Sequence, residues 1–176
     1  MNIGVLALQG DFQSHVKALK QLNVQSKLVK QKEDLEGLDA LIIPGGESTV
    51  MNKLLSIQGM TESLKYFLET KPVFGTCAGL ILLQQFGAFP EMKIERNFYG
   101  SQLESFVGDL NGIFSMKGVF IRAPKIIECK DTILLSLDGE PVAVKRGNKI
   151  GICFHPELTN DIRLHEYFIS VCMNKS

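Results

Sequence analysis

The sequence lacks the features that mark a membrane protein, a secreted protein or a nucleic-acid-binding protein. Its 19 lysines and arginines are balanced by 19 acidic residues, and they form no basic cluster that would favour a phosphate backbone. No apolar stretch approaches the ~20 residues that a membrane-spanning helix requires. The first apolar run, residues 3–8, is too short for a signal peptide and has no basic residue before it. We therefore expect a cytoplasmic protein without nucleic-acid or membrane partners.

Cysteine is too scarce and too irregularly spaced to form a structural framework. The chain has four cysteines and no C-x-x-C pair, so the sequence predicts neither a zinc site nor a set of disulfides. The thiols lie far apart, at Cys77, Cys129, Cys153 and Cys172. A chain of 176 residues can bury roughly 70% of its unfolded surface, so it needs no disulfide or metal to fold. We expect reduced thiols and one domain, residues 1–176, because repeats and linkers are absent.

The first half of the chain alternates between buried strands and amphipathic helices. Apolar runs that suit strands of a parallel sheet occur at residues 3–8, 38–43 and 72–74, and residues 26–29 form a weak further strand. Helical spacing of apolar side chains predicts helices over residues 12–22 and 60–68. A third helix follows a P-G-G turn, with Ser48 or Thr49 as its N-cap. This alternation predicts an α/β protein.

The second half of the chain has a different texture. Short apolar or alternating runs are separated by turn signals, at residues 118–121, 126–128, 133–137, 141–144 and 149–154. We interpret these runs as a meander or a mixed extension of the sheet. Leu164, Phe168, Val171 and Cys172 then predict a closing helix.

A strand-to-helix turn with a central cysteine is the first candidate for chemistry. The segment G-T-C-A-G, residues 75–79, places glycines two positions before and two positions after Cys77, as a nucleophile elbow requires. The N-terminus of the following helix favours the thiolate form of such a cysteine. The alternative is a chance turn with a buried thiol, since cysteine is among the most frequently buried residues.

A histidine and a glutamate near the other end of the chain could complete a catalytic set. His155 follows an apolar strand, and active sites of open α/β sheets gather at strand ends. Glu157 could orient the imidazole while His155 takes the thiol proton. The alternative for His155 is a histidine of the core or the surface. His15 and His165 lie in helical patterns, and we expect His165 to be solvated.

Backbone amides at two turns could stabilise an oxyanion. In an elbow, one donor is the N–H of the residue after the nucleophile, here Ala78. The turn Gly45-Gly46 is a candidate for the second donor, because glycine lets backbone amides approach a ligand. The alternative is an ordinary strand-to-helix turn.

The cysteine elbow and the H-P-E segment at residues 155–157 together resemble the pattern of class I glutamine amidotransferases. More narrowly, the chain resembles the glutaminase subunits of pyridoxal 5′-phosphate synthases. The motifs that carry this resemblance run in the family's order over almost the whole chain: I-G-V-L-A-L-Q-G at 3–10, P-G-G-E-S-T at 44–49, F-G-T-C-A-G-L at 74–80, E-R-N at 95–97, S-F at 105–106, V-F-I-R-A-P at 119–124 and F-H-P-E-L-T at 154–159. Together these collinear motifs are far more specific than any one of them.

The resemblance implies a flavodoxin-like α/β fold, a three-layer sandwich with a central, mostly parallel sheet and a small antiparallel extension. It implies that Cys77, His155 and Glu157 hydrolyse L-glutamine to L-glutamate and ammonia through a thioester. Gly46 and Ala78 would form the oxyanion hole. The residues implied to contact glutamine are Gly46, Glu47, Ser48, Arg96, Ile121 and Arg122. A guanidinium suits the α-carboxylate of glutamine, although without the resemblance both arginines would be taken as solvated surface charges.

The resemblance also implies a partner. Ammonia would pass to a separate synthase subunit that builds pyridoxal 5′-phosphate, so the chain would belong to a hetero-oligomer and would itself hold no metal or cofactor. The family is generally weakly active until this subunit docks and completes the oxyanion hole. Residues 9–10 and the Gly45-Gly46 turn are natural places for such coupling.

The chain departs from the family's pattern in three places. Only eight residues separate Phe86 from Glu95, where the family usually has a longer connection with an extra strand, so the sheet edge and Arg96 are open questions. F-Y-G-S-Q stands at residues 98–102 after E-R-N. Lys125 holds a position that is often histidine.

Three other functions remain open on the sequence. One is an amidotransferase subunit for another acceptor, as in imidazole glycerol phosphate or anthranilate synthesis, although P-G-G-E-S-T and V-F-I-R-A-P argue against it. Another is a related cysteine peptidase or chaperone-like protein, which would not need H-P-E. The third is a partner-binding homologue without activity, which the short connection before Glu95 leaves open.

Overall fold

The computed structural model describes residues 1–96, 98 and 105–174. Its centre is a nine-stranded sheet with the strand order β2-β1-β3-β4-β11-β10-β9-β6-β7. The first five of these strands are parallel: β2 Gln25–Val29, β1 Asn2–Leu6, β3 Ala40–Ile43, β4 Val73–Thr76 and β11 Lys149–Ile152. Their order is the 2-1-3-4-5 order of flavodoxin-like folds. The expected fold class is therefore confirmed.

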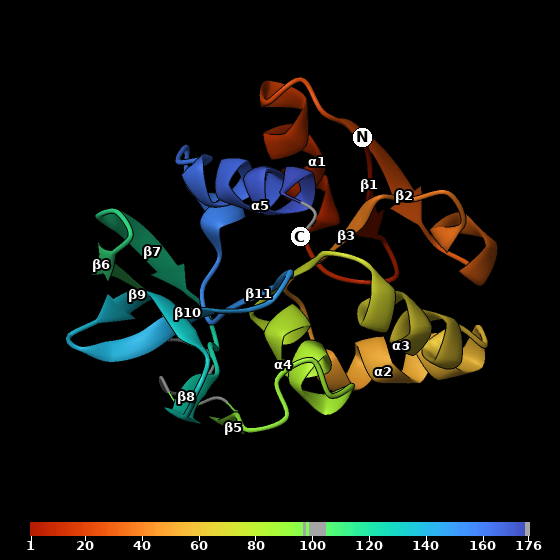
Figure 1. Ribbon diagram of the computed structural model, residues 1–176. Coiled ribbons are helices and arrows are strands. Elements are labelled where there is room, and N and C mark those ends of the chain that lie inside the picture. The colour runs from red at the N-terminus through yellow and green to blue at the C-terminus, as the bar shows by residue number, and fades with distance from the viewer. Residues whose placement is uncertain (97, 99–104, 175–176) are drawn as a thin grey trace.

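Helices cover both faces of the parallel strands and form the outer layers of the sandwich (Figure 1). On one face lie α1 Phe12–Gln21 and α5 Arg163–Met173. On the other face lie α2 Ser48–Ile57, α3 Thr61–Thr70 and α4 Ala78–Gln85. Because both faces are covered, β3, β4 and β11 are buried along their whole length. Phe74 of β4 packs against Phe168 of α5, with ring centroids 5.5 Å apart.

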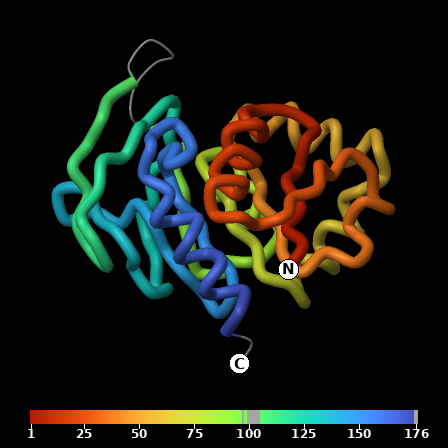
Figure 2. Tube along the Cα trace, turned by 90° about the horizontal axis from the view of Figure 1, so that it is seen from above, coloured from red at the N-terminus to blue at the C-terminus, as the bar shows by residue number. Residues whose placement is uncertain are grey.

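The second half of the chain extends the sheet with antiparallel strands, as the sequence predicts. These strands are β10 Glu140–Arg146, β9 Thr132–Leu137, β6 Phe106–Gly112 and β7 Met116–Phe120. Figure 2 shows this green-to-cyan extension on one side of the molecule and the red and orange first half on the other. A separate two-stranded sheet pairs β5 Lys93–Glu95 with β8 Lys125–Glu128.

Two details differ from the expectations. Helix α2 has Glu47 as its N-cap without a side-chain capping bond, so the prediction of Ser48 or Thr49 is wrong. The Glu47 N–H donates to Oε1 of Gln9 over 2.8 Å, and this hydrogen bond fixes the turn at Glu47, one residue before Ser48.

The sequence does not predict strand β6, because its segment F-V-G-D-L-N-G contains residue types that are rare in strands. Pairing with β7 on one side and β9 on the other stabilises it.

The short connection before Glu95 still holds a strand at the edge of the small sheet. Ile94 of β5 pairs with Ile126 of β8. Lys125, the other departure from the family's pattern, forms an ion pair with Glu140 at 2.7 Å. Its Nζ also lies 4.2 Å from the ring centroid of Phe98.

Asn97 of E-R-N, and residues 99–102 of the divergent segment, lie outside the described residues. In the part of the chain that the structure describes, no helix combines the length and the apolar character needed to cross a membrane.

Candidate active site

Two adjacent parallel strands bring Cys77 and His155 to the same edge of the sheet. β4 and β11 pair in register as far as Thr76 and Ile152, and the Cys77 N–H donates to the Ile152 carbonyl over 2.8 Å. Cys77 directly follows β4, and His155 follows β11 after a short turn. Ala78 begins α4, so its N–H is among those without an intrahelical partner. The carboxyl edge of an open parallel sheet is where such folds bind ligands.

The backbone of Cys77 has the strained conformation of an elbow. Its φ of 48° and ψ of −103° lie in a region that residues other than glycine rarely adopt. A Cβ at Gly75 would lie 2.6 Å from the carbonyl carbon of Gly79, and one at Gly79 would lie 2.1 Å from the carbonyl oxygen of Ile43. Only glycine fits at either position, so strand and helix meet closely at the turn. The Cys77 thiol donates to the Ile121 carbonyl over 3.8 Å.

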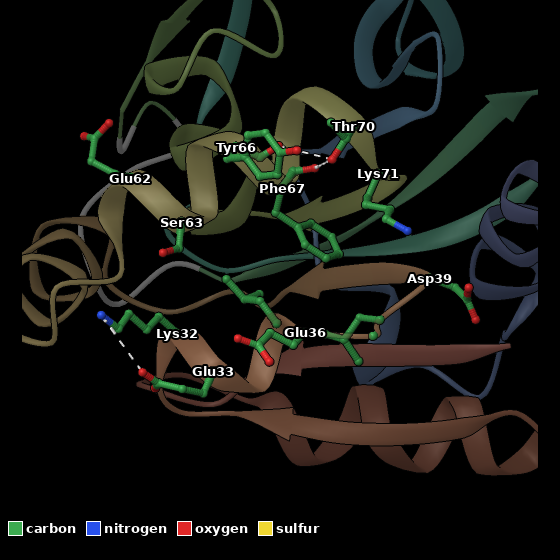
Figure 3. Close-up of a pocket in the computed structure, with 13 residues that line it drawn as sticks. Lys32, Glu33, Glu36, Asp39, Glu62, Ser63, Tyr66, Phe67, Thr70 and Lys71 are labelled. Carbon is green, nitrogen blue, oxygen red and sulfur yellow. Dashed lines mark hydrogen bonds and ion pairs between the residues drawn. The ribbon is translucent and has the colours of Figure 1, made fainter.

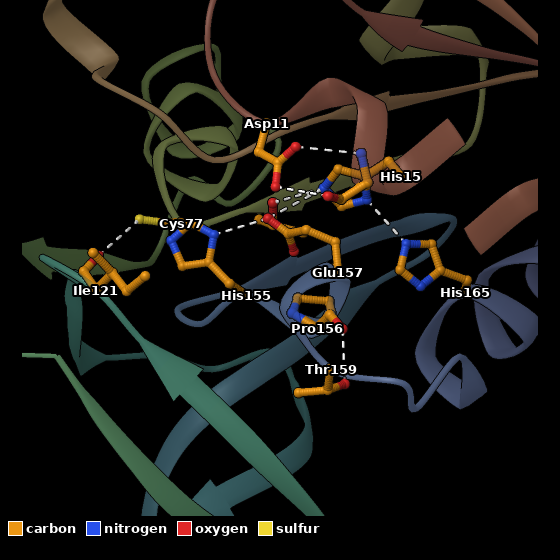
Figure 4. Close-up of polar contacts among 11 residues, drawn as sticks. Asp11, His15, Cys77, Ile121, His155, Pro156, Glu157, Thr159 and His165 are labelled. Carbon is orange, nitrogen blue, oxygen red and sulfur yellow. Dashed lines mark hydrogen bonds and ion pairs between the residues drawn. The ribbon is translucent and has the colours of Figure 1, made fainter. Parts of the chain in front are cut away.

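The imidazole of His155 is held by Glu157. Nδ1 of His155 lies 2.8 Å from Oε1 of Glu157, whose side chain is fully buried. Pro156 begins the 3₁₀ helix η2 Pro156–Leu158, and its fixed φ suits the first turn of a helix. This turn directs Glu157 back toward the ring (Figure 4). With Nδ1–H donated to the carboxylate, Nε2 is the nitrogen available to accept a thiol proton.

The charges of this pair stabilise each other despite burial. Burial by itself lowers the pKa of His155, but hydrogen bonds with Cys77 and Glu157 raise it to about 10. Burial by itself raises the pKa of Glu157, but hydrogen bonds from His15 and His155 hold it well below its usual range. The pair is therefore an imidazolium and a carboxylate at neutral pH. A protonated imidazole beside a cysteine favours the nucleophilic thiolate form of that cysteine.

The turn after β3 packs directly against the imidazole. A Cβ at Gly45 would lie 2.3 Å from Cε1 of His155, and a Cβ at Gly46 would lie 2.4 Å from Oε1 of Gln9. Gln9 also accepts the hydrogen bond from the Glu47 N–H, and the Glu47 side chain is exposed. The structure thus brings the predicted Gly45-Gly46 turn to the same sheet edge as the imidazole.

The other residues predicted to contact a substrate lie in three places. Ile121 contacts Cys77 through its carbonyl, and the exposed Arg122 follows it with a φ of 46°. Ser48 is buried at the start of α2. Arg96 is exposed just after β5, and no hydrogen bond or ion pair among the described residues joins it to Cys77.

Sequence reasoning missed a pair of buried histidines behind Glu157 (Figure 4). Nε2 of His15, in α1, lies 3.5 Å from Oε1 of Glu157, and Nδ1 of His15 lies 2.9 Å from Nε2 of His165. The expectation of a solvated His165 is wrong, because its ring packs between α1 and Phe74 and is 1% exposed. Helical spacing could have revealed the burial of His15, which lies one turn before the core residue Leu19.

A separate surface groove carries no comparable chemistry. This groove of about 640 Å³ lies between η1 Lys32–Leu35 and α3, with Tyr66 and Thr70 among its lining residues (Figure 3). Its lining includes neither cysteine nor histidine among the residues that the structure describes. Over the same described residues, no three His, Cys, Asp or Glu side chains are grouped so that they could hold a metal ion. The edge at Cys77 is therefore the candidate active site.

Comparison with known proteins finds relatives over nearly the whole chain. The model of the SNO glutamine amidotransferase family matches residues 5–174. A curated relative from Francisella philomiragia, named pyridoxal 5′-phosphate synthase subunit PdxT, is 45% identical over 97% of this chain and 99% of its own. A relative of the same name from Thermoplasma acidophilum is 48% identical, over 97% and 93%.

Solved structures with a similar fold are found as well. One described as a glutamine amidotransferase is 44% identical, with a TM-score of 0.91 over 97% of this chain and 98% of that one. The structure of PurLQS from Thermotoga maritima has a TM-score of 0.77 at 15% identity, over 98% of this chain and 97% of that one. The second likeness shows the fold alone.

Proposed function

This chain belongs to the SNO glutamine amidotransferase family, and from that premise we propose that it hydrolyses L-glutamine to L-glutamate and ammonia. Residues 1–176 form a single glutaminase domain. The observation that carries the proposal is the 2.8 Å pair of His155 and Glu157 beside the strained Cys77. A merely structural thiol would need neither a strained backbone nor a charged imidazole just after the adjacent strand.

The first half-reaction forms a thioester. Cys77 reacts as a thiolate beside the protonated His155, and its sulfur attacks the carboxamide carbon of glutamine, so a C–S bond forms and the carbonyl electrons move to oxygen. The N–H groups of Ala78 and Gly46 stabilise this oxyanion, and the loss of one such donor typically costs about 10²–10³ in rate. His155 then protonates the amide nitrogen, the C–N bond breaks and ammonia leaves.

The second half-reaction restores the thiolate and the protonated His155. His155, neutral after ammonia has left, takes a proton from water, the resulting hydroxide attacks the thioester, and the C–S bond breaks, so glutamate is released and Cys77 leaves as the thiolate. General acid–base catalysis of this kind contributes roughly 10²–10⁴ in rate. Glu157 keeps Nδ1 of His155 protonated throughout, so Nε2 always faces the reacting atoms.

Glutamine binds across the sheet edge in this proposal. The contacting residues are Gly46, Glu47, Ser48, Arg96, Ile121 and Arg122. An arginine guanidinium matches the α-carboxylate of the substrate in a forked geometry. The contact between Ile121 and the thiol supports Arg122 for this role. Arg96 would approach from the small sheet.

The ammonia passes to a synthase subunit that builds pyridoxal 5′-phosphate, within a hetero-oligomer in the cytoplasm. Relatives named as subunits of that synthase, 45% and 48% identical over 97% of this chain, support this partner. They also disfavour an amidotransferase for another acceptor. The four free thiols fit a reducing compartment.

The test is glutamate release by the wild type and by Cys77→Ala, each with and without the synthase subunit. We expect the wild type to be faster with the subunit, and Cys77→Ala to lose roughly 10⁴-fold or more while it remains folded. Cys129→Ala is a matched control, because that half-buried thiol lies outside the site. Undiminished turnover by Cys77→Ala would overturn the mechanism. A wild type that stays inactive with its synthase subunit would favour the partner-binding alternative.

A further inference from the structure

The carboxylate of Glu157 has a second neighbour besides His155. Its Oε1 lies 2.8 Å from Nδ1 of His155 and 3.5 Å from Nε2 of His15. Its other oxygen, Oε2, is buried and has no hydrogen-bond partner in the described part of the chain. The orientation of the carboxylate therefore depends on the two histidines that meet at Oε1. One of them belongs to the proposed catalytic set, and the other has no assigned role.

The surroundings decide which nitrogen of His15 carries a proton. Nε2 faces Oε1 of Glu157 and lies 3.3 Å from Oγ1 of Thr76. Without a proton, Nε2 would direct its lone pair at a buried carboxylate, which is repulsive in a medium of low dielectric constant. Nε2 therefore carries the proton, which it shares between the carboxylate and the threonine hydroxyl.

His165 must then donate to the other nitrogen of His15. In the tautomer of His15 that carries its proton on Nε2, Nδ1 is an acceptor, and it lies 2.9 Å from Nε2 of His165. Burial lowers the pKa of His165 to about 3, so His165 is neutral and has one proton, which sits on Nε2. Its Nδ1 is an unprotonated acceptor, buried and unpartnered among the described residues. A buried acceptor without a partner is better tolerated than a buried N–H without one.

We propose that His15 is a positioning residue, which donates Nε2–H to Glu157, and that His165 selects the tautomer of His15 that can donate. The inference rests on the proposed glutaminase function and deepens it. Glu157 must hold still for His155 to keep its orientation through both half-reactions, and groups behind a catalytic residue commonly supply that restraint. The arrangement is a chain from Cys77 through His155, Glu157 and His15 to α5.

Charged side chains near this pair include Asp11 and Lys17. Asp11 caps the start of α1 by accepting from the backbone and side chain of Ser14. Lys17 lines a pocket of about 260 Å³ beside Glu157 and His165. These side chains are retained in every variant below, so differences among the variants report on the two histidines.

The experiment compares His15→Leu, which fills the space without a donor, with His15→Gln, which can present an N–H near the same position. Leu19→Ala is the matched control, because it alters the buried face of α1 one turn away from His15. The first readout is glutamate release with the synthase subunit present. The second is alkylation of Cys77 by iodoacetamide as a function of pH, followed by mass spectrometry of the Cys77 peptide, which needs neither glutamine nor a partner.

We expect His15→Leu to lower kcat about 10–100-fold, the range found when a partner behind a metal-bound histidine is removed, with KM unchanged. Its alkylation profile should move to higher pH, because a displaced Glu157 supports the imidazolium less. His15→Gln should recover most of both losses. Leu19→Ala should keep the wild-type kcat and alkylation profile below its unfolding transition.

Each outcome separates the two levels of the argument. If the wild type releases no glutamate but His15→Leu still shifts the alkylation profile, the proposed function fails and the positioning role stands. A folded His15→Leu with wild-type kcat and profile would overturn the positioning role, and so would a His15→Gln as impaired as His15→Leu. If His15→Leu does not fold, the comparison moves to His165→Leu and His165→Gln. We expect His165→Leu to lose less activity than the range given for His15→Leu, and His165→Gln to recover that loss. Equal activity of the two His165 variants would contradict the proposal.

Discussion

Two histidines on opposite sides of one buried carboxylate have opposite protonation states. On the side of Cys77, burial opposes the charge of His155, but hydrogen bonds with Cys77 and Glu157 raise its pKa to about 10. On the far side, burial and the nearby His15 lower the pKa of His165 to about 3. Both rings are largely buried, so the difference comes from their partners. His155 contacts a carboxylate, whereas His165 contacts another imidazole.

The two sides of Glu157 therefore serve different purposes. The side of Glu157 that faces the thiol has a strained backbone and glycine walls, as the proposed reaction requires. The side that faces α1 and α5 has two buried imidazoles in contact with each other, which are well suited to hold a geometry. Predictions that alter the carboxylate, then each histidine, and finally a remote ion pair test this division.

Glu157→Gln should have the largest effect, because it changes both sides at once. An amide cannot stabilise the imidazolium of His155, and its NH₂ group can reverse the tautomer. We expect kcat for glutamate release to fall about 10⁴-fold, as when the orienting acid of a serine protease triad becomes an amide. Glu36→Gln, at an exposed carboxylate, is the control. A loss of less than tenfold would show that the charge of Glu157 is not required.

The pH dependence of folding stability should separate the two histidines. The folded pKa of His155, about 10, lies above its ordinary value of 6.5, so its contribution is present below pH 6.5 and is lost as the pH rises toward 10. The folded pKa of His165, about 3, lies below 6.5, so its contribution is present above pH 6.5 and is lost as the pH falls toward 3. Each contributes a slope of at most about 1.4 kcal/mol per pH unit.

Urea unfolding between pH 3 and pH 10 measures both limbs. His155→Gln should flatten the alkaline limb, and His165→Gln should flatten the acid limb down to the range in which Glu157 and the other carboxylates titrate. Stability that does not change between pH 6.5 and pH 9 in the wild type would contradict a charged His155.

Asp109→Asn should have the smallest effect. Asp109 forms an ion pair with Lys117 on the β6–β7 hairpin, and the two side chains are 79% and 64% exposed. Exposed pairs of this kind contribute below about 1 kcal/mol. We expect the free energy of unfolding measured in urea to change by no more than that, and the rate of glutamate release to be unchanged. A tenfold loss of kcat would show that the β6–β7 hairpin is coupled to the active site, which would contradict a purely local role of this ion pair.

Local patterns in the sequence predict the parallel half of the molecule well. Strands buried on both faces are continuous apolar runs, so β1, β3 and β4 can be recognised from neighbouring residues alone. The elbow is also local, since Gly75 and Gly79 flank Cys77 within one turn. Strand β6 could not be recognised in this way, because its stability comes from two neighbouring strands rather than from its own residue types.

The sequence by itself determined the α/β class, the elbow at Cys77 and the pairing of His155 with Glu157 in a two-residue step, all of which depend on short-range spacing. Only the tertiary structure decided what lies behind Glu157. His15 and His165 are 150 residues apart and meet because α1 and α5 pack on the same face of the sheet. Periodicity can show that a histidine is buried, but it cannot name the partner that burial brings to it. The partner depends on which helices share a face of the sheet, and the pKa of the histidine depends on that partner.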